Sequence, residues 1–362
     1  MIVFQIAVGL TMGAIAYYGI IQTKSVSTKY LVGYGVIIPA MLYLPFPFIE
    51  FFDVRAICLR MGLIAAPLTV TLKCLEPMYG FIPDYVTWSL RDFVIHFGFI
   101  QYARIDLKTK RRIPSTLTSI VNAVTNYIKH SLINGVLFSI LIPCAFMPFS
   151  TSRPDTDIFI ATDINQLLNN LLAATMVSFS LVYSLNGVAS IIQLLVGFQT
   201  EPAVDNPIFG SSSPSDFWGN RWNKLIHRGL KQGIYKPVRM ANGSRNVATM
   251  AAFLASGVDH EYTWAVMFYQ SSHEEDKYTP PFGKTMLFFG WNGIVLVFEH
   301  WIGRERWDAM VKPMPRLLVS LFVVMAALPV GHLFTGDFRH GGYFDSLVTT
   351  FPMVLVERQL AM

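Results

Sequence analysis

The chain has 362 residues, of which 53% are hydrophobic and only 14% are charged, and its formal net charge is +5. Because a soluble domain usually carries about 25% charged residues, this composition argues against soluble domains and predicts one polytopic, all-α membrane unit over residues 1–362. Three widely spaced cysteines, Cys58, Cys74 and Cys144, form no CxxC pair. We therefore expect apolar buried thiols and no disulfide framework.

The first 200 residues are expected to form N-terminal transmembrane helices, since a spanning helix needs about 20 mostly apolar residues. Arg60 lies inside one apolar stretch and is expected to snorkel toward a membrane surface. The uncharged stretch after Asp163 is long enough for one steeply tilted helix, or for a helix that bends at Asn186 and Gly187. The predicted spans are 2–22, 30–49, 56–75, 131–150 and 164–200, with a short re-entrant or interfacial piece at 94–102.

The rest of the chain predicts further spans at 245–268, 283–301 and 317–334, and a last apolar segment, 346–356, that is too short to cross upright. We expect eight or nine spans in total. Basic residues gather at 221–245 and 304–316, and a pair of spans separates these two segments, so both lie on one side of the membrane. The positive-inside rule places that side in the cytosol and the acidic loop 271–281 in the lumen.

Residues 213–232 read SPSDFWGNRWNKLIHRGLKQ. Ser213 is a predicted N-cap, Pro214 takes the first helical position, and Asp216 takes the third. At 3.6 residues per turn the segment forms one amphipathic helix, whose tryptophans would fix its depth in the membrane interface. Its basic residues predict either an anchor for anionic headgroups or a site for an anionic substrate, and composition does not separate the two. The basic stripe consists of Arg221, Lys224, Arg228 and Lys231, beside a stripe of Trp218, Trp222 and Leu225.

Residues 246–268 form an apolar helix that Asp259, His260 and Glu261 interrupt. His260 lies about 20 Å from the basic end of this helix. Ionisable groups at such depth usually face the protein interior or a water-filled cavity, and an imidazole suits general-base catalysis. Ser256 lies one turn earlier and is expected to orient the ring, whereas Asp259 and Glu261 are expected to pair elsewhere or close the end of a tunnel. A structural histidine and a transporter's proton relay are the alternatives, although the sequence shows no internal repeat.

The remaining histidines and the motifs that the sequence lacks limit the classes of protein to be considered. We expect structural or solvated roles for the histidines at 227, 273, 300 and 332. The chain has no H-E-x-x-H spacing, no phosphate-binding or dinucleotide-binding glycine motif, and no G-x-S-x-G elbow. The sequence thus argues against a nucleotide-hydrolysing pump and a serine hydrolase, and predicts no metal, no resident cofactor and no nucleic-acid partner.

Three segments within 205–300 resemble the wax synthase-like branch of the membrane-bound O-acyltransferases: NPIFGSSSPSDFWGNRWN, FLASGVDHEY and FFGWNGIVLVFE. The resemblance implies a helical membrane fold around an internal reaction chamber, usually in the endoplasmic reticulum. It also implies transfer of a fatty acyl group from the co-substrate acyl-coenzyme A to a lipid alcohol within membrane lipids. A long-chain fatty alcohol is the first expectation, with diacylglycerol and sterols as alternatives.

The resemblance also implies roles for particular residues. His260 matches the family's catalytic histidine, and Asn223 matches the asparagine of a Trp-Asn motif in the related sterol and diacylglycerol acyltransferases. The sequence departs from the family pattern at Asn220, often basic in plant members, and at Asp259, often apolar, where an acid could shift the pKa of the base or the acceptor preference. The expected acyl-coenzyme A site comprises Trp218, Arg221, Trp222, Lys224, Arg228 and Lys231, and the expected supporting residues are Asp216, Ser256 and Glu261.

Overall fold

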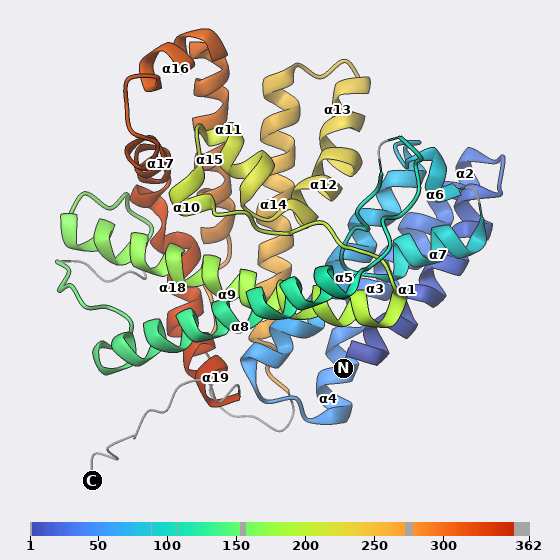
Figure 1. The fold of residues 1–362 in the computed structure, drawn as a ribbon, viewed down its shortest axis with the longest axis horizontal. Helices are drawn as coiled ribbons and strands as arrows, with labels where there is room; N and C mark the ends of the chain where they lie inside the picture. Colours follow the sequence, from blue (N-terminus) through green and yellow to red (C-terminus); the bar gives the residue numbers. More distant parts are fainter. Residues whose placement is uncertain (1, 88, 107, 153–156, 272–277, 351–362) are drawn as a thin grey trace.

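The computed structural model describes residues 2–350 except 88, 107, 153–156 and 272–277 (Figure 1). Every regular element in these residues is a helix, apart from isolated β-bridges that pair Ala103 with Thr200, Ile105 with Arg112 and Pro114 with Phe198. This confirms the predicted all-α fold. His273 and most of the acidic loop lie outside the described residues, as does the second part of the last apolar segment.

The N-terminal helices surround α5 (Ile57–Met78), and they lie together on one side of the molecule (Figure 1). A π-helical turn at Tyr17–Ile21 extends the first helix, and another at Gly33–Ile37 joins the second to the third. The other helices of this group are α1 (Ile2–Ala16), α2 (Val26–Val32), α3 (Ile38–Tyr43), α4 (Pro45–Phe52), α6 (Asp84–Thr87) and α7 (Leu90–Gly98).

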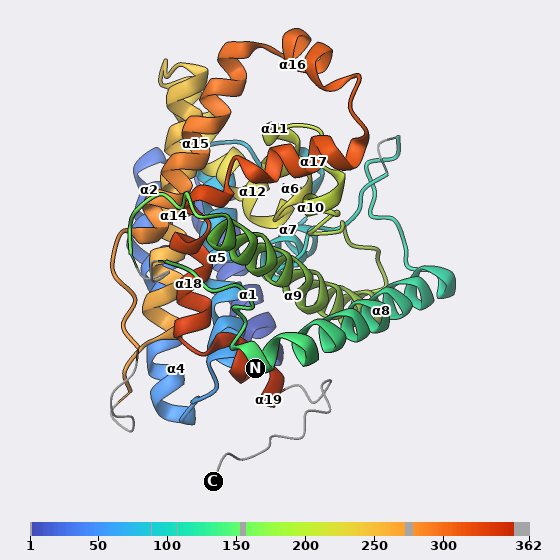
Figure 2. The ribbon, with the colours of Figure 1, turned by 90° about the vertical axis from the view of Figure 1, so that its left-hand side faces the viewer.

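The helices α8 (Leu117–Leu141) and α9 (Ile164–Val196) form an antiparallel pair that crosses the rest of the bundle (Figure 1). Figure 2 shows α8 projecting away from the other helices. A 3₁₀ turn at Ile142–Cys144 ends α8. The 33 residues of α9 extend for about 50 Å, longer than the hydrocarbon core of a bilayer. The stretch after Asp163 is therefore one helix that continues through Asn186 and Gly187, and its first 22 residues, Ile164–Leu185, are long and apolar enough to cross a membrane.

The C-terminal half is built around α14 (Arg245–Met267) and α15 (Lys284–Ile302), which pack side by side in opposite directions (Figure 1). The basic start of α14 and the end of α15 lie at the same end of the pair, as the charge pattern predicts. A 3₁₀ turn at Leu328–Val330 precedes α18. The remaining helices are α10 (Pro207–Gly210), α11 (Pro214–Asp216), α12 (Lys224–Leu230), α13 (Lys236–Met240), α16 (Arg304–Val311), α17 (Arg316–Met325), α18 (His332–His340) and α19 (Tyr343–Thr350).

Six helices in the described residues are long and apolar enough to cross a membrane, or seven if the bent pair Arg316–Val330 and His332–His340 counts as one span. The chain is thus a polytopic membrane protein, but the expected total of eight or nine spans is not confirmed. The structure confirms a helix, α14, over the predicted span 245–268. This helix is not one of the six candidate membrane spans, because Asp259, His260 and Glu261 reduce its mean hydropathy. The predicted span at 131–150 belongs to a helix that begins at Leu117.

Two buried cations of α5 bind the carboxyl ends of neighbouring helices. Arg60 is fully buried, and its guanidinium donates to the carbonyls of Val54 (2.6 Å) and Tyr269 (2.6 Å). Lys73 donates to the carbonyls of His96 and Phe99 at the end of α7. The last carbonyls of a helix lack partners within the helix and attract positive charge. The expectation that Arg60 snorkels to a membrane surface is therefore wrong, because its charge is used inside the protein.

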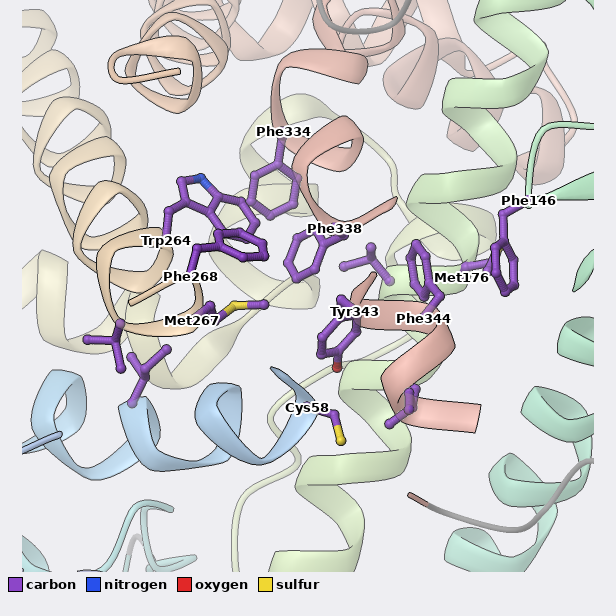
Figure 3. Packing of buried hydrophobic residues seen from close by; sticks show 14 of the residues in the cluster. Cys58, Phe146, Met176, Trp264, Met267, Phe268, Phe334, Phe338, Tyr343 and Phe344 are labelled. Atoms are coloured by element: carbon purple, nitrogen blue, oxygen red, sulfur yellow. The ribbon is translucent and has the colours of Figure 1, made fainter. Parts of the chain in front are cut away.

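An aromatic core joins α14 to α18 and α19 (Figure 3). The ring of Trp264 packs edge-on against Phe338 with 4.7 Å between centroids, and Phe338 contacts Tyr343 at 5.1 Å. The buried indole N–H of Trp264 donates to the hydroxyl of Thr285 on α15 (2.7 Å), so this large apolar residue leaves no unpaired donor. Phe334 lies beside Trp264 in the same cluster. This aromatic core forms one end of a large internal cavity.

Two glycines, Gly229 of α12 and Gly233 of the π-helical turn Lys231–Tyr235 that follows it, bring this segment close to α5. A methyl group at Gly229 would lie 2.6 Å from Leu72 Cβ, and one at Gly233 would lie 2.7 Å from Leu75 Cβ. Both contacts are shorter than van der Waals separation and involve the stiff base of a side chain. Only glycine therefore permits this approach of the two helices.

We expect Gly229→Ala to push α12 away from α5 and to cost about 1–3 kcal/mol of stability through overpacking. The measurement is thermal unfolding of the detergent-solubilised protein, followed by size-exclusion fluorescence. Gly290→Ala on α15 is the matched control, since its nearest neighbour is the Leu254 methyl at 4.0 Å. An unchanged melting temperature for Gly229→Ala would contradict the described packing.

Candidate active site

The segment 213–232 begins as predicted but does not continue as one helix. The Ser213 hydroxyl accepts from the backbone N–H of Asp216, and Pro214 opens α11. A π-helical turn follows at Phe217–Arg221, and the backbone then leaves the helical conformation at Trp222 and Asn223 before α12 begins. The predicted single amphipathic helix is therefore wrong, because the break points the two halves in different directions.

Asp216 is the anchor of the first half. Its carboxylate accepts from the Arg221 guanidinium (2.7 Å), from the backbone N–H and hydroxyl of Ser212 (both 3.0 Å), and from Asn220 (3.2 Å). Burial alone would raise the pKa of Asp216, but the hydrogen bonds from Arg221, Ser212 and Asn220 outweigh it and lower the pKa to about 2. Asp216 is therefore ionised at neutral pH and holds the turn before the break.

A cavity of about 760 Å³ lies beside this broken segment. Helices α5, α9, α12, α14, α15 and α18 all contribute to its wall, together with the broken segment's Ser215, Trp218, Gly219, Asn220, Trp222 and Asn223. One end, at the start of α14 and the end of α15, is lined by charged and polar side chains, including Arg228, Lys231, Arg245 and His300. The other end reaches Phe334 and Phe338 of the aromatic core (Figure 3). The cavity thus runs from a basic mouth to an apolar floor, which suits an amphipathic ligand with an anionic head.

His260 lines this cavity with a defined ring orientation. Its Nδ1 lies 2.7 Å from the carbonyl oxygen of Ser256. A carbonyl oxygen only accepts hydrogen bonds, so Nδ1 carries the proton and Nε2 of the neutral ring holds the lone pair. Phe289 (4.5 Å between centroids) and Phe334 (5.1 Å) pack against the ring and hold it from two sides. Ser256 therefore orients the ring as expected, through its main chain rather than its hydroxyl.

Asn223 lies at the break and lines the same cavity. Its Oδ1 accepts from the backbone N–H of Ile226 (3.4 Å), so the side chain is the N-cap of α12. Because the oxygen is used in the cap, the amide Nδ2 is the atom left to donate to a ligand. The fold thus brings Asn223 and His260 to one cavity, although 37 positions separate them in the chain.

The two acids beside His260 have different surroundings. Glu261 accepts from the backbone N–H of Gly283 (3.1 Å), at the start of α15, and is not among the residues that line the cavity. This agrees with the expected pairing away from His260. Asp259 lines the cavity, and its Oδ2 is buried without a hydrogen-bond partner in the described residues. Of the two roles expected for Asp259, pairing elsewhere is not seen at Oδ2 in the described residues, and closing the end of a tunnel stays a prediction.

The four predicted basic residues divide into two pairs. Arg221 bonds Asp216, and Lys224 lies 3.6 Å from the carboxylate of Asp205, and neither lines the cavity. Arg228 and Lys231 do line it, and Arg228 also lies 3.6 Å from the carboxylate of Glu201. The guanidinium of Arg228 stacks on the ring of Tyr102 at 4.1 Å. The break in the helix explains the division, since Arg221 precedes it and cannot share a stripe with residues of α12.

The two tryptophans lie inside the protein rather than at the membrane interface. Trp218 and Trp222 contact each other at 6.0 Å between ring centroids, and both pack on Phe217. Both also line a smaller apolar cavity of about 50 Å³ between α15 and α17, so they separate this space from the larger cavity. The prediction that they set the depth of an interfacial helix is wrong, because the segment folds inward over α14 and α15.

Sequence reasoning missed other residues of this cavity. His227 and His300, both predicted to be structural or solvated, line its mouth. Burial and the nearby Lys231 ammonium lower the pKa of His227 to about 4, so this ring is neutral at neutral pH. Glu299 accepts from the backbone N–H and the hydroxyl of Ser215 (both 2.8 Å) and fastens the broken segment to α15. The sequence feature that could have indicated a role for Glu299 is its position at the end of FFGWNGIVLVFE.

Comparison with protein families matches residues 201–291 to the "Membrane bound O-acyl transferase family". The matched stretch contains the broken segment, all of α14 and the first part of α15, and therefore includes Asn223 and His260. This confirms the resemblance that the three sequence segments predicted. The family similarity thus falls on the part of the chain that forms the cavity wall.

Three proteins of Arabidopsis thaliana illustrate the similarity. "Probable long-chain-alcohol O-fatty-acyltransferase 9" is 31% identical over 184 residues, 47% of this chain and 50% of that protein. "Probable long-chain-alcohol O-fatty-acyltransferase 3" is 30% identical over 151 residues, 39% of this chain and 41% of that protein. "Acyl-CoA--sterol O-acyltransferase 1" is 29% identical over 166 residues, 43% and 45% of the two chains. The chain therefore spans about half the length of these curated relatives.

We expect Asp216→Asn to lower the melting temperature of the solubilised protein at neutral pH, because the ion pair with Arg221 is lost. The folded pKa of about 2 lies below the ordinary value of 3.8, so the wild-type advantage is complete above pH ~4 and is lost as the pH falls toward 2. Melting curves of both proteins between pH 2 and 8 measure this difference. Glu305→Gln, at an exposed position of α16, is the control, and a constant difference down to the lowest pH would refute the role of Asp216.

Proposed function

We propose that the protein is a membrane-bound O-acyltransferase that transfers a fatty acyl group from acyl-coenzyme A to the hydroxyl of a lipid alcohol. The observation that carries the proposal is the orientation of His260, whose Nδ1 is bound to the Ser256 carbonyl while Nε2 is left for the cavity. The family similarity over residues 201–291 supports the reaction class. The proposed location is the endoplasmic reticulum membrane, with the basic mouth in the cytosol.

The reaction uses His260 first as a base and then as an acid. Nε2 accepts the proton of the acceptor hydroxyl while the hydroxyl oxygen forms a bond to the acyl carbon. The carbon–sulfur bond then breaks, and coenzyme A leaves as a thiolate that takes the proton from the imidazolium. The Nδ1 contact with the Ser256 carbonyl stabilises the cation that forms in between. The mainly apolar lining of the cavity disfavours water and so favours the alcohol over hydrolysis.

The acyl donor enters through the basic mouth. Arg228 and Lys231 are placed to attract the phosphates of coenzyme A, and the acyl chain extends toward the apolar floor at Phe334 and Phe338. The free amide of Asn223 is a donor for the thioester carbonyl, on which negative charge grows during the attack. Two of the three named relatives act on long-chain alcohols, according to their names, and one on sterols. We propose a long-chain alcohol as the acceptor, with a sterol or a diacylglycerol as the alternatives.

Product analysis in cells tests the proposed reaction. The protein is expressed in cells that lack neutral-lipid acyltransferases, and labelled fatty acid is supplied with a fatty alcohol, a sterol or a diacylglycerol precursor. The proposal predicts a new labelled ester with one of these acceptors. No ester with any of them, from protein that is well expressed in the membrane, would refute it.

His260→Ala is expected to lower the rate of ester formation by about 10² to 10⁴ without loss of folding, because it removes only the base. Initial rates of purified protein with saturating acyl-coenzyme A measure this effect. His130→Ala, on α8 and outside the cavity lining, is the control for the loss of an imidazole. Wild-type rates in His260→Ala would disprove the assignment of the base.

Lys224, the first residue of α12, and Lys231, the residue directly after its end, are expected to differ in their effect on acyl-coenzyme A binding. Lys231→Ala should raise the KM for acyl-coenzyme A about two- to fivefold, most strongly at low ionic strength, because one exposed charge near the phosphates is lost. Lys224→Ala should leave this KM unchanged, since Lys224 pairs with Asp205 outside the cavity. Steady-state kinetics at two salt concentrations measure both values. Equal effects of the two substitutions would contradict the position of the mouth.

A further inference from the structure

A buried polar cluster lies beside the basic mouth of the cavity, and the proposed reaction does not use it. Its centre is Tyr102, which follows α7 and is only 3% exposed. The Tyr102 hydroxyl donates to Glu76 Oε1 of α5 (2.9 Å), and His96 Nε2 of α7 lies 3.2 Å from Glu76 Oε2. A buried carboxylate is costly unless donors satisfy it. The bond from the hydroxyl therefore fixes the Tyr102 ring from the side of α5.

The backbone around Tyr102 is fixed as well. The Tyr102 carbonyl accepts from the backbone N–H of Glu201 (2.9 Å), and an isolated β-bridge joins Ala103 to Thr200. This pairing brings both side chains to Arg228. The guanidinium carbon lies 4.1 Å from the centroid of the Tyr102 ring, and Nη1 lies 3.6 Å from the Glu201 carboxylate. An aromatic ring and a carboxylate thus both contact the Arg228 side chain.

Arg228 lies between this cluster and the substrate space. Arg228 lines the large cavity, whereas Tyr102 and Glu201 are not among the residues of its lining. Tyr102 and His96 instead line a second, much smaller cavity, to which Arg228 also contributes. A change at Tyr102 therefore reaches a ligand in the large cavity through Arg228.

The ring and the carboxylate act differently when an anion binds. The half-exposed Glu201 offers Arg228 the same kind of charge as a phosphate, so it competes with the ligand in a weak, solvent-screened pair. The face of the Tyr102 ring attracts the guanidinium without bringing a negative charge of its own. The contact with the ring can therefore persist while a phosphate replaces Glu201.

We propose that Tyr102 is a positioning residue, which holds the guanidinium of Arg228 at the mouth for a phosphate of acyl-coenzyme A. This inference rests on the proposed function and adds a residue to its acyl-donor site. Tyr102 lies outside the cavity lining and acts through Arg228. Its loss should therefore change the KM for the acyl donor and leave kcat almost unchanged.

The test measures ester formation by purified full-length protein in lipid nanodiscs, with labelled palmitoyl-coenzyme A and the acceptor that the product analysis identifies. Tyr102→Leu should raise the KM for palmitoyl-coenzyme A about three- to tenfold, with kcat within about twofold of the wild type. Tyr102→Phe keeps the ring and should raise the KM by less than about twofold. Phe81→Leu is the matched control and should keep the wild-type KM, since it removes a ring that lies 4.8 Å from the Lys236 ammonium, outside the cavity lining.

A double-mutant cycle separates positioning from a general loss of structure. In the Arg228→Ala background, Tyr102→Leu should cause no further rise in KM, because the guanidinium on which the ring acts is gone. The same rise with and without Arg228, or a wild-type KM for Tyr102→Leu, would overturn this inference and leave the proposed reaction intact. A fall in kcat at an unchanged KM would overturn it as well.

Two further outcomes are also decisive. If Tyr102→Leu does not fold, Arg228→Lys decides, because an ammonium does not stack on a ring as a planar guanidinium does. Arg228→Lys should then raise the KM nearly as much as Arg228→Ala, and a wild-type KM would overturn this inference. No ester from the wild type with a long-chain alcohol, a sterol or a diacylglycerol would overturn the proposed reaction, and this inference with it.

Discussion

The chemistry proposed for this protein depends on one hydrogen bond, between His260 Nδ1 and the carbonyl of Ser256. This bond lies within a single helix, so the ring orientation does not depend on the arrival of another element. It fixes the proton on Nδ1 and leaves the lone pair of Nε2 for the cavity. Phe289 and Phe334 close the space around the ring and keep it from turning. The other helices surround this histidine and form a cavity of suitable charge and shape.

The break between Trp222 and Asn223 builds the other side of the cavity. A continuous helix would have kept Arg221 and Lys231 on one stripe and left the tryptophans at a surface. The broken segment instead folds over α14 and α15, where Glu299 and Asp216 fasten its first half. Its second half lies against α5, and Asn223 caps it. One polar residue thus both begins a helix and faces the substrate space.

Much of this arrangement was predictable from local patterns. The helix start at Ser213 followed from its capping residues, and the position of His260 at an internal cavity followed from an apolar helix interrupted by charge. The break after Trp222 was not predictable, because helical periodicity continues through residues 213–232 and only tertiary contacts overrule it. The burial of Arg60 was likewise hidden, since one of its partners is the carbonyl of Tyr269, just after α14 and about 200 positions away in the chain. The separate surroundings of Asp259 and Glu261 also depend on packing, because both acids lie beside the same histidine.

The most direct test of the account is a cryo-electron microscopy structure with a non-hydrolysable thioether analogue of acyl-coenzyme A. The account predicts that the carbon in place of the acyl carbonyl lies beside His260 Nε2 and Asn223, with the phosphates at Arg228 and Lys231 and the chain toward Phe338. An analogue bound with its sulfur outside the large cavity, or with His260 Nε2 turned away from it, would contradict the central role of this histidine.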